Sequence, residues 1–314
     1  MLQIHLFGKF CVNDIAQSVN ILEARKAQEL FSYLLLHRNR PQPRENLVDV
    51  LWSQSTKDQA QKGLRQALWQ LQTSLETPAL GVADAILQVD AGWVQINPAV
   101  DLWLDVAMLE QAFAQTQGIT GQALDGQSAQ RLALVVQLYQ GDLLEGCYED
   151  WCLIERTRLQ NIYLALLDKL VDYNEMQANY ETALAYGQQI LHYDCAREQT
   201  HRKLMKLYCL AGNRTGALRQ YEACVAALFT ELDVKPAKRT EALYQAIKAD
   251  QVEERPPNAL LTLPQRPPST SLPALLDHLQ QMSVALADLQ RNVAEDIEII
   301  ETLLHFPPKV APKE

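Results

Sequence analysis

The hydrophobic pattern begins with a period of two and then changes to a helical period. Apolar residues alternate over Leu2–Leu6 and Phe10–Val12, a turn follows at Asn13–Asp14, and Val19–Ile21 resumes the alternation. Such runs predict a small antiparallel sheet. From about Ala24 to His37 apolar residues recur every three or four positions, which predicts an amphipathic helix.

Two more helices follow before the pattern returns to strands. Pro41 and Pro43 end the first helix and suit the start of a second over Arg44–Trp52. The segment Ser55–Asp58 has the S-x-x-D form of a capping box, so we expect a third helix from Asp58 to about Leu75. The apolar positions of the third helix share one face: Ala60, Leu64, Ala67, Leu68, Leu71 and Leu75.

The opposite face of the third helix carries Lys62, Arg65, Gln66, Trp69 and Thr73 at helical spacing. A helix lying in the major groove of DNA needs cations for phosphates, amide or guanidinium groups for base edges, and some flat apolar surface. The alternative is a polar face that contacts only water, because basic helical faces are common. The face alone leaves both interpretations open.

A hairpin is expected after the third helix. Leu87–Asp90 and Trp93–Ile96 alternate strictly around Ala91-Gly92. A sheet, three helices and a hairpin, in this order, resemble the winged helix of the OmpR/PhoB type, with the hairpin as the wing. This order favours the DNA-reading interpretation of the third helix.

From about Leu102 to Ile247 the pattern is almost wholly helical. Ala183-Leu184 and Ala217-Leu218 occupy matching positions 34 residues apart, which is the period of tetratricopeptide (TPR) repeats. A helical bundle is the alternative. The aromatic residues of this region are candidates for a concave groove, but the core is the favoured interpretation: Tyr139, Trp151, Tyr208 and Tyr221.

The C-terminal part of the chain has two further patterns. Residues 251–271 contain five prolines and predict an extended, fairly stiff linker. Residues 272–306 then carry apolar residues at the four-three spacing of a heptad seam, interrupted at Asp296. We favour a coiled coil with a partner chain over docking on the helical domain of the same molecule.

Charge and composition narrow the function. The net charge is −10, yet residues 1–100 hold nine Lys and Arg against nine Asp and Glu, so only this part would not repel an anionic polymer. The six scattered cysteines suggest reduced thiols that pack as small apolar groups. There is no stretch with the length and apolarity of a membrane span, which predicts a cytoplasmic protein. Since nucleotide-binding, hydrolase and metalloprotease motifs are missing, we expect no enzyme, catalytic residue, cofactor or metal.

The chain resembles the SARP-like bacterial transcriptional activators, in which a winged helix precedes a TPR-like bacterial transcriptional activator domain (BTAD). In the first hundred residues the likeness rests on Arg25-Lys26-Ala27-Gln28, Tyr33-Leu34-Leu35-Leu36-His37, Pro43-Arg44-Glu45, Leu51-Trp52 and Leu64-Arg65-Gln66-Ala67-Leu68-Trp69. Further on it rests on Tyr139-Gln140-Gly141-Asp142-Leu143, Trp151, Glu155-Arg156, His201-Arg202-Lys203-Leu204, Gly212-Asn213-Arg214 and Glu231-Leu232 to Pro236. The likeness covers residues 1–250 and does not include the C-terminal segment.

The resemblance implies roles for particular residues. Lys62, Arg65, Gln66 and Trp69 would face the major groove, Arg44 would hold a phosphate, and the hairpin turn would reach the adjacent minor groove. The full set of expected DNA-binding residues is Arg44, Lys57, Lys62, Arg65, Gln66, Trp69, Gln70, Thr73 and Trp93. Recognition helices of this family often contain more arginine, so weak binding by a monomer is expected.

The resulting prediction is a mainly α protein with an N-terminal α+β part. It comprises a winged helix-turn-helix domain (1–100), a TPR-like activator domain (101–250), a Pro-rich linker (251–271) and a coiled-coil-like helix (272–306). The expected partners are double-stranded DNA, RNA polymerase and a second copy of the chain, bound through the last helix or the TPR-like domain. The alternative is a TPR-type interaction scaffold whose winged helix no longer binds DNA.

Overall fold

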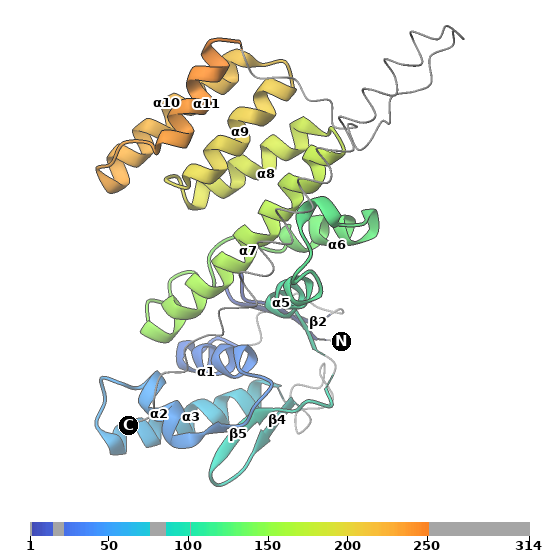
Figure 1. The fold of residues 1–314 in the computed structure, drawn as a ribbon. Coiled ribbons are helices and arrows are strands. Elements are labelled where there is room, and N and C mark those ends of the chain that lie inside the picture. The colour runs from blue at the N-terminus through green and yellow to red at the C-terminus, as the bar shows by residue number, and fades with distance from the viewer. Residues whose placement is uncertain (1, 15–21, 76–85, 101, 251–314) are drawn as a thin grey trace, which may run out of the picture. The chain divides into compact units, whose positions relative to one another are not determined.

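The computed structural model describes residues 2–14, 22–75, 86–100 and 102–250. Two compact units, Met1–Glu254 and Arg255–Glu314, make up the chain, and the second unit lies outside the described residues. The expected strand at Val19–Ile21, the linker and the C-terminal helix therefore also lie outside them. The first unit is mainly helical with a small α+β region at its N-terminus, as the sequence predicts (Figure 1).

The N-terminal region has the expected order of strands and helices. Its elements are β1 (Leu2–His5), β2 (Cys11–Asp14), α1 (Arg25–Leu36), β3 (Gln42–Pro43), α2 (Arg44–Leu51), α3 (Lys57–Leu75), β4 (Leu87–Val89), β5 (Trp93–Ile96) and β6 (Leu102–Leu104). The predicted turn at Asn13–Asp14 is wrong, because both residues belong to β2, where they pair with β1.

The first sheet joins the beginning of the chain to a segment a hundred residues away. Its strand order is β2-β1-β6; β1 pairs antiparallel with β2 and parallel with β6. Ile4 is wholly buried and lies opposite Val12 on one side and Leu104 on the other. Residues 102–104 were expected to begin the helical region, and that expectation is wrong, because they form the third strand of this sheet.

The second sheet contains the predicted hairpin. Its order is β3-β5-β4, and Val89 of β4 lies opposite Val94 of β5. The Asp90 N–H donates to the Trp93 carbonyl at 2.9 Å, which leaves Ala91-Gly92 as a two-residue turn. Val94 and Ile96 are buried, so the inner side of the hairpin joins the hydrophobic core.

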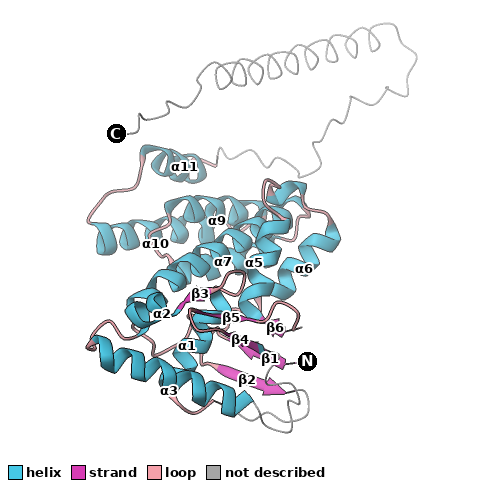
Figure 2. Ribbon diagram, turned by 90° about the horizontal axis from the view of Figure 1, so that it is seen from below, coloured by secondary structure: helices cyan, strands magenta, loops and turns pink. Residues whose placement is uncertain are grey.

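Helices make up the remainder of the described chain (Figures 1 and 2). They are α5 (Asp105–Gln115), the short 3-10 helix η1 (Gly121–Ala123), α6 (Gly126–Val136), α7 (Asp150–Met176), α8 (Tyr180–Tyr193), α9 (Glu198–Leu210), α10 (Arg214–Leu232) and α11 (Lys238–Lys248). The repeated alanines, Ala183 of α8 and Ala217 of α10, are both wholly buried, and each lies in the first helix of a pair, α8–α9 and α10–α11. Among the described residues, no helix has the length and apolarity needed to cross a membrane.

Asp105 joins the winged region to the helical region. Its carboxylate is wholly buried; Oδ2 accepts the N–H groups of Leu6 (2.8 Å) and Phe7 (3.0 Å), and Oδ1 accepts that of Val106 (2.7 Å). Burial raises the pKa of this carboxyl, and the three N–H groups and His5 act against that rise. The residues that follow β1 and the start of α5 are thus held by one side chain.

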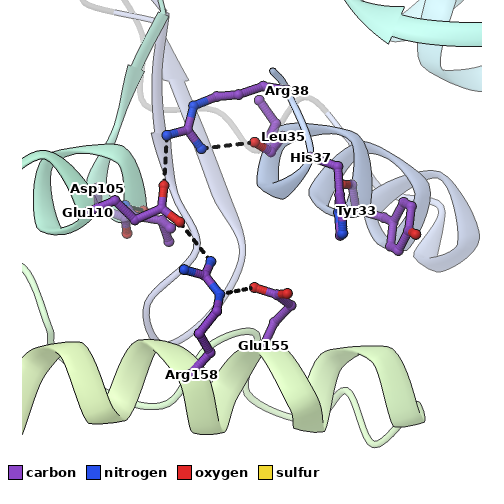
Figure 3. A network of polar contacts seen from close by, with 9 residues as sticks. Tyr33, Leu35, His37, Arg38, Asp105, Glu110, Glu155 and Arg158 are labelled. Carbon is purple, nitrogen blue, oxygen red and sulfur yellow. Dashed lines mark hydrogen bonds and ion pairs between the residues drawn. The ribbon is translucent and has the colours of Figure 1, made fainter. Parts of the chain in front are cut away.

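A second polar connection links α1 to α5 and α7 (Figure 3). Glu110 of α5 accepts from Arg38, just after α1, at 2.7 Å and from Arg158 of α7, also at 2.7 Å. Arg158 also pairs with Glu155 on its own helix. The core is continuous beneath these pairs, since Ile4, Phe31 and Leu166 belong to one cluster of buried side chains. The position of the three N-terminal helices relative to α5 and α7 is therefore fixed by apolar and polar contacts together.

Candidate nucleic-acid interface

Helix α3 separates its two faces as the sequence predicts. All six expected apolar positions are buried: Ala60, Leu64, Ala67, Leu68, Leu71 and Leu75. Lys62, Arg65, Gln66 and Thr73 are exposed, and Trp69 keeps 64% of its surface accessible. An exposed tryptophan of this degree is unusual and is available for a partner surface. Figure 2 shows α3 at one edge of the described fold, with α1 on its inner side.

The start of α3 differs by one residue from the prediction. The helix begins at Lys57, and the Thr56 N–H donates to Oε1 of Gln59 at 3.4 Å. This contact is one half of a capping box with Thr56 as the N-cap, so the predicted pair of Ser55 and Asp58 is wrong. Ser55–Asp58 and Thr56–Gln59 both fit the capping-box pattern, and the helix begins one residue after Thr56, as the second segment requires.

The absence of a side chain at Gly63 allows α2 and α3 to approach closely. A Cβ atom at Gly63 would lie 2.6 Å from Nε1 and 3.0 Å from Cε2 of Trp52, the residue that ends α2. The ammonium group of Lys26 lies 5.8 Å from the centre of the Trp52 ring. Trp52 therefore packs between α1, α2 and α3 and sets the angle at which α3 is presented.

The cations of α2 and α3 surround one hollow next to the hairpin turn. A hollow of about 700 Å³ is lined by Arg44, Lys57, Arg65 and Ala91, among others. The Arg44 N–H donates to the Gly92 carbonyl at 3.0 Å, which connects the start of α2 to the turn. Arg44 itself is half-buried, and within the described residues its Nε atom has no hydrogen-bond partner.

Acidic side chains share this hollow. Glu45 and Asp49 of α2 line it together with the three cations, and Asp58 lies one turn before Lys62 on α3. The surface around α3 is consequently close to neutral rather than strongly cationic. Such a balance limits the affinity that phosphate contacts can supply.

The other expected site residues occupy the borders of this surface. Gln70 is half-buried on α3, and Trp93 is half-buried on β5, opposite Pro43 of β3. Sequence reasoning did not include Trp52, Ser53 or Gln61, which also line the hollow. Trp52 was used as the end of the second helix and in the family likeness, and Gly63, which makes room for it, is the signal that was overlooked.

The four aromatic residues considered for a groove pack within the fold. Tyr139 and Trp151 are buried, and Tyr208 and Tyr221 are half-buried. Tyr221 stacks on Tyr244 with ring centres 4.0 Å apart, and Tyr139 stacks on Tyr163 at 4.1 Å. These contacts support the core interpretation. Within the described ranges, His, Cys, Asp and Glu side chains do not gather in a group that could hold a metal ion.

Comparison with known proteins identifies the class of the helical region. A family model, the bacterial transcriptional activator domain, matches residues 104–248. The matched stretch is the part of the chain for which the sequence predicts a domain of this class.

One solved structure shows that the likeness of fold extends beyond this domain. The chain is similar to Mycobacterium tuberculosis EmbR, solved in complex with a low affinity phosphopeptide, with 15% sequence identity and a TM-score of 0.66. The match covers 92% of this chain and 71% of that one. No curated protein matches the chain in sequence. The domain match agrees with the predicted bacterial transcriptional activator domain, and the likeness to EmbR shows a shared fold.

Proposed function

We propose that the chain is a DNA-binding transcriptional activator that reads the major groove of double-stranded DNA with α3. The observation that carries this proposal is the exposed stripe formed by Lys62, Arg65, Gln66 and Trp69. None of the described residues covers Arg65 or Gln66. Guanidinium and amide groups at this spacing suit base edges, and an ammonium group suits a phosphate.

The residues around the stripe would position the helix on the duplex. Arg44 and Lys57 lie on the same hollow as Arg65 and would contact phosphates, while the Ala91-Gly92 turn and Trp93 would approach the adjacent minor groove. Gln70 and Thr73 would extend the contact toward the end of α3. Because Glu45 and Asp49 are close, a single copy would bind weakly.

Stable binding would then require a second copy of the chain. Two copies joined through residues 272–306 or through the TPR-like domain would engage two half-sites about one helical turn apart. The activator domain would contact RNA polymerase. Sedimentation of the full chain, compared with its Leu279→Glu variant, tests the role of the C-terminal segment; an unchanged mass would assign self-association to the TPR-like domain.

Salt dependence of DNA binding is the decisive experiment. Fragments from the genomic neighbourhood of the gene are titrated with full-length protein at several salt concentrations. We expect the logarithm of affinity to fall steeply with the logarithm of salt concentration, and Arg65→Ala to reduce the slope by about one unit. Arg131→Ala is the matched control, since it removes an exposed arginine from α6 and should leave the slope unchanged.

The near-neutral surface around α3 favours one alternative function. If the winged helix binds proteins instead of DNA, the chain is an interaction scaffold of the TPR type. DNA retention would then be absent or insensitive to salt, and Arg65→Ala and Arg131→Ala would behave alike.

A further inference from the structure

Two of the six thiols lie together where the chain enters α7. Cys147 belongs to the loop before the helix and Cys152 to its first turn, and the two thiols interact with each other. The Cys152 sulfur is also 3.8 Å from the Leu143 carbonyl oxygen. Both residues are buried, whereas Cys195 is exposed. The pair was not evident from sequence because its C-x4-C spacing matches no standard motif.

Arg156 holds the loop that carries Cys147. Its guanidinium donates to the carbonyl oxygens of Leu143 (2.9 Å), Leu144 (3.3 Å) and Cys147 (3.1 Å). Gly146 next to Cys147 has a φ of +84°, a conformation that glycine adopts without strain. The loop backbone is therefore anchored beside α7, and a flexible residue adjoins the first thiol.

The two sulfurs have different acid strengths. The hydrogen bond from Cys152 and one from the backbone N–H of Glu149 lower the pKa of Cys147, against the effects of burial, Glu29 and the Glu149 carboxylate. The same hydrogen bond to Cys147, followed by burial, raises the pKa of Cys152. Since the thiolate is the reactive form, Cys147 is the nucleophile of the pair and Cys152 stays protonated.

Cys147 can be reached by a small molecule. It lines a hollow of about 350 Å³ together with Lys9, Arg25 and Phe10. Arg25 lines the same hollow, where it pairs with Glu29 at 3.0 Å and also interacts electrostatically with Cys147. A peroxide of two oxygen atoms fits in this space.

We propose that Cys147 and Cys152 are a modification site at which hydrogen peroxide forms a reversible disulfide. The Cys147 thiolate attacks one peroxide oxygen, the O–O bond breaks, and sulfenic acid and hydroxide result. Cys152 then gives its proton to the sulfenic oxygen as its sulfur attacks the sulfenic sulfur; the S–S bond forms, the S–O bond breaks, and water leaves. Two thiols are oxidised, one peroxide is reduced to water, and a dithiol reductant reverses the change.

Disulfide formation would alter the contact between the winged region and the activator domain. The sulfurs must approach to about 2 Å, which draws the loop toward α7. The Gly146 carbonyl now accepts from Arg25 of α1 at 3.4 Å, and Glu149 pairs with Lys26 of α1 at 3.3 Å. Both connections from α1 end on residues within or next to the loop that moves.

The proposal is tested by treating the full chain with a small excess of hydrogen peroxide, blocking free thiols and digesting with trypsin. Both cysteines fall in the peptide of residues 132–156, because the flanking cleavage sites are Arg131 and Arg156. We expect this peptide to become lighter by two hydrogen atoms, to resist the blocking reagent, and to regain its mass with a dithiol. Its oxidation should be at least about tenfold faster than that of Cys195, the exposed reference thiol.

Two variants separate the steps. In Cys152→Ser, peroxide should stop at sulfenic acid on Cys147, which a 1,3-diketone reagent labels; in Cys147→Ser neither the disulfide nor the label should form. Cys195→Ser is the matched control and should oxidise like the wild type. The proposal is overturned if the wild-type peptide keeps both thiols blockable while Cys195 oxidises, or if disulfides form only between chains. The wild-type measurement decides even where a variant folds poorly.

Discussion

Replacing Asp105 by alanine should destabilise the first unit more than the same replacement of any exposed Asp or Glu would. The substitution leaves three buried N–H groups, those of Leu6, Phe7 and Val106, without their acceptor. Each buried N–H group without an acceptor costs about 1–3 kcal/mol. Relaxation of the backbone or entry of water recovers part of this cost. We therefore expect a loss of about 3–5 kcal/mol in the free energy of unfolding. This loss is a large share of the stability of a typical domain.

The pH dependence gives the same prediction a second test. Because burial raises the pKa of Asp105, the folded state binds its proton more tightly than the unfolded state. The stabilising effect of this linkage is complete below the unfolded pKa and is lost as pH rises through the folded pKa. The stability difference between wild type and Asp105→Asn should therefore grow as pH falls from about 7 to about 4.

Urea unfolding followed by circular dichroism and tryptophan fluorescence measures both effects, and coincident transitions justify a two-state treatment. Asp125→Ala is the matched control: this carboxylate also accepts a backbone N–H at a helix start, from Ser128 at 2.9 Å, but it is exposed. Equal losses for Asp105→Ala and Asp125→Ala would refute the reasoning, as would a stability difference from Asp105→Asn that shrinks on acidification.

Three further substitutions test packing and the connection between regions, each by its urea midpoint. Gly121→Ala should cost about 1–3 kcal/mol, because its Cβ would lie 2.9 Å from the Lys169 Cα; an unchanged midpoint would contradict this close approach. Gly187→Ala should cost less than Gly121→Ala, since the obstructing Leu204 side chain can rotate. Glu110→Gln should cost about 1 kcal/mol, because it weakens two partly exposed ion pairs at once, and high salt should reduce the difference from wild type.

The parts of the fold that were predictable are those set by local periodicity. The buried and exposed faces of α3 follow from a helical repeat over 19 residues, and the hairpin follows from alternation around Ala91-Gly92. The order of elements then placed Lys62 and Arg65 on an exposed helix. These inferences needed no information about distant parts of the chain.

The parts that were missed depend on distant partners. The strand at Leu102–Leu104 has only three residues, and its pairing with β1 cannot be predicted from the pattern of neighbouring residues. In the sequence Asp105 looks like an ordinary first-turn carboxylate of α5, because its two distant N–H donors, Leu6 and Phe7, lie just after β1. Cys147 and Cys152 look like isolated thiols, since a loop and not a helical repeat brings their sulfurs together.

The parallel pairing of β6 with β1 also determines where this chain can be divided. A fragment that stops at residue 100 loses β6 and exposes one edge of β1, with unpaired backbone groups and the apolar surface of Ile4. Such a fragment is expected to aggregate whether or not α3 is correctly folded. A usable fragment of the winged region would have to retain β6 and α5, so this region and the start of the helical region have to be expressed as one piece.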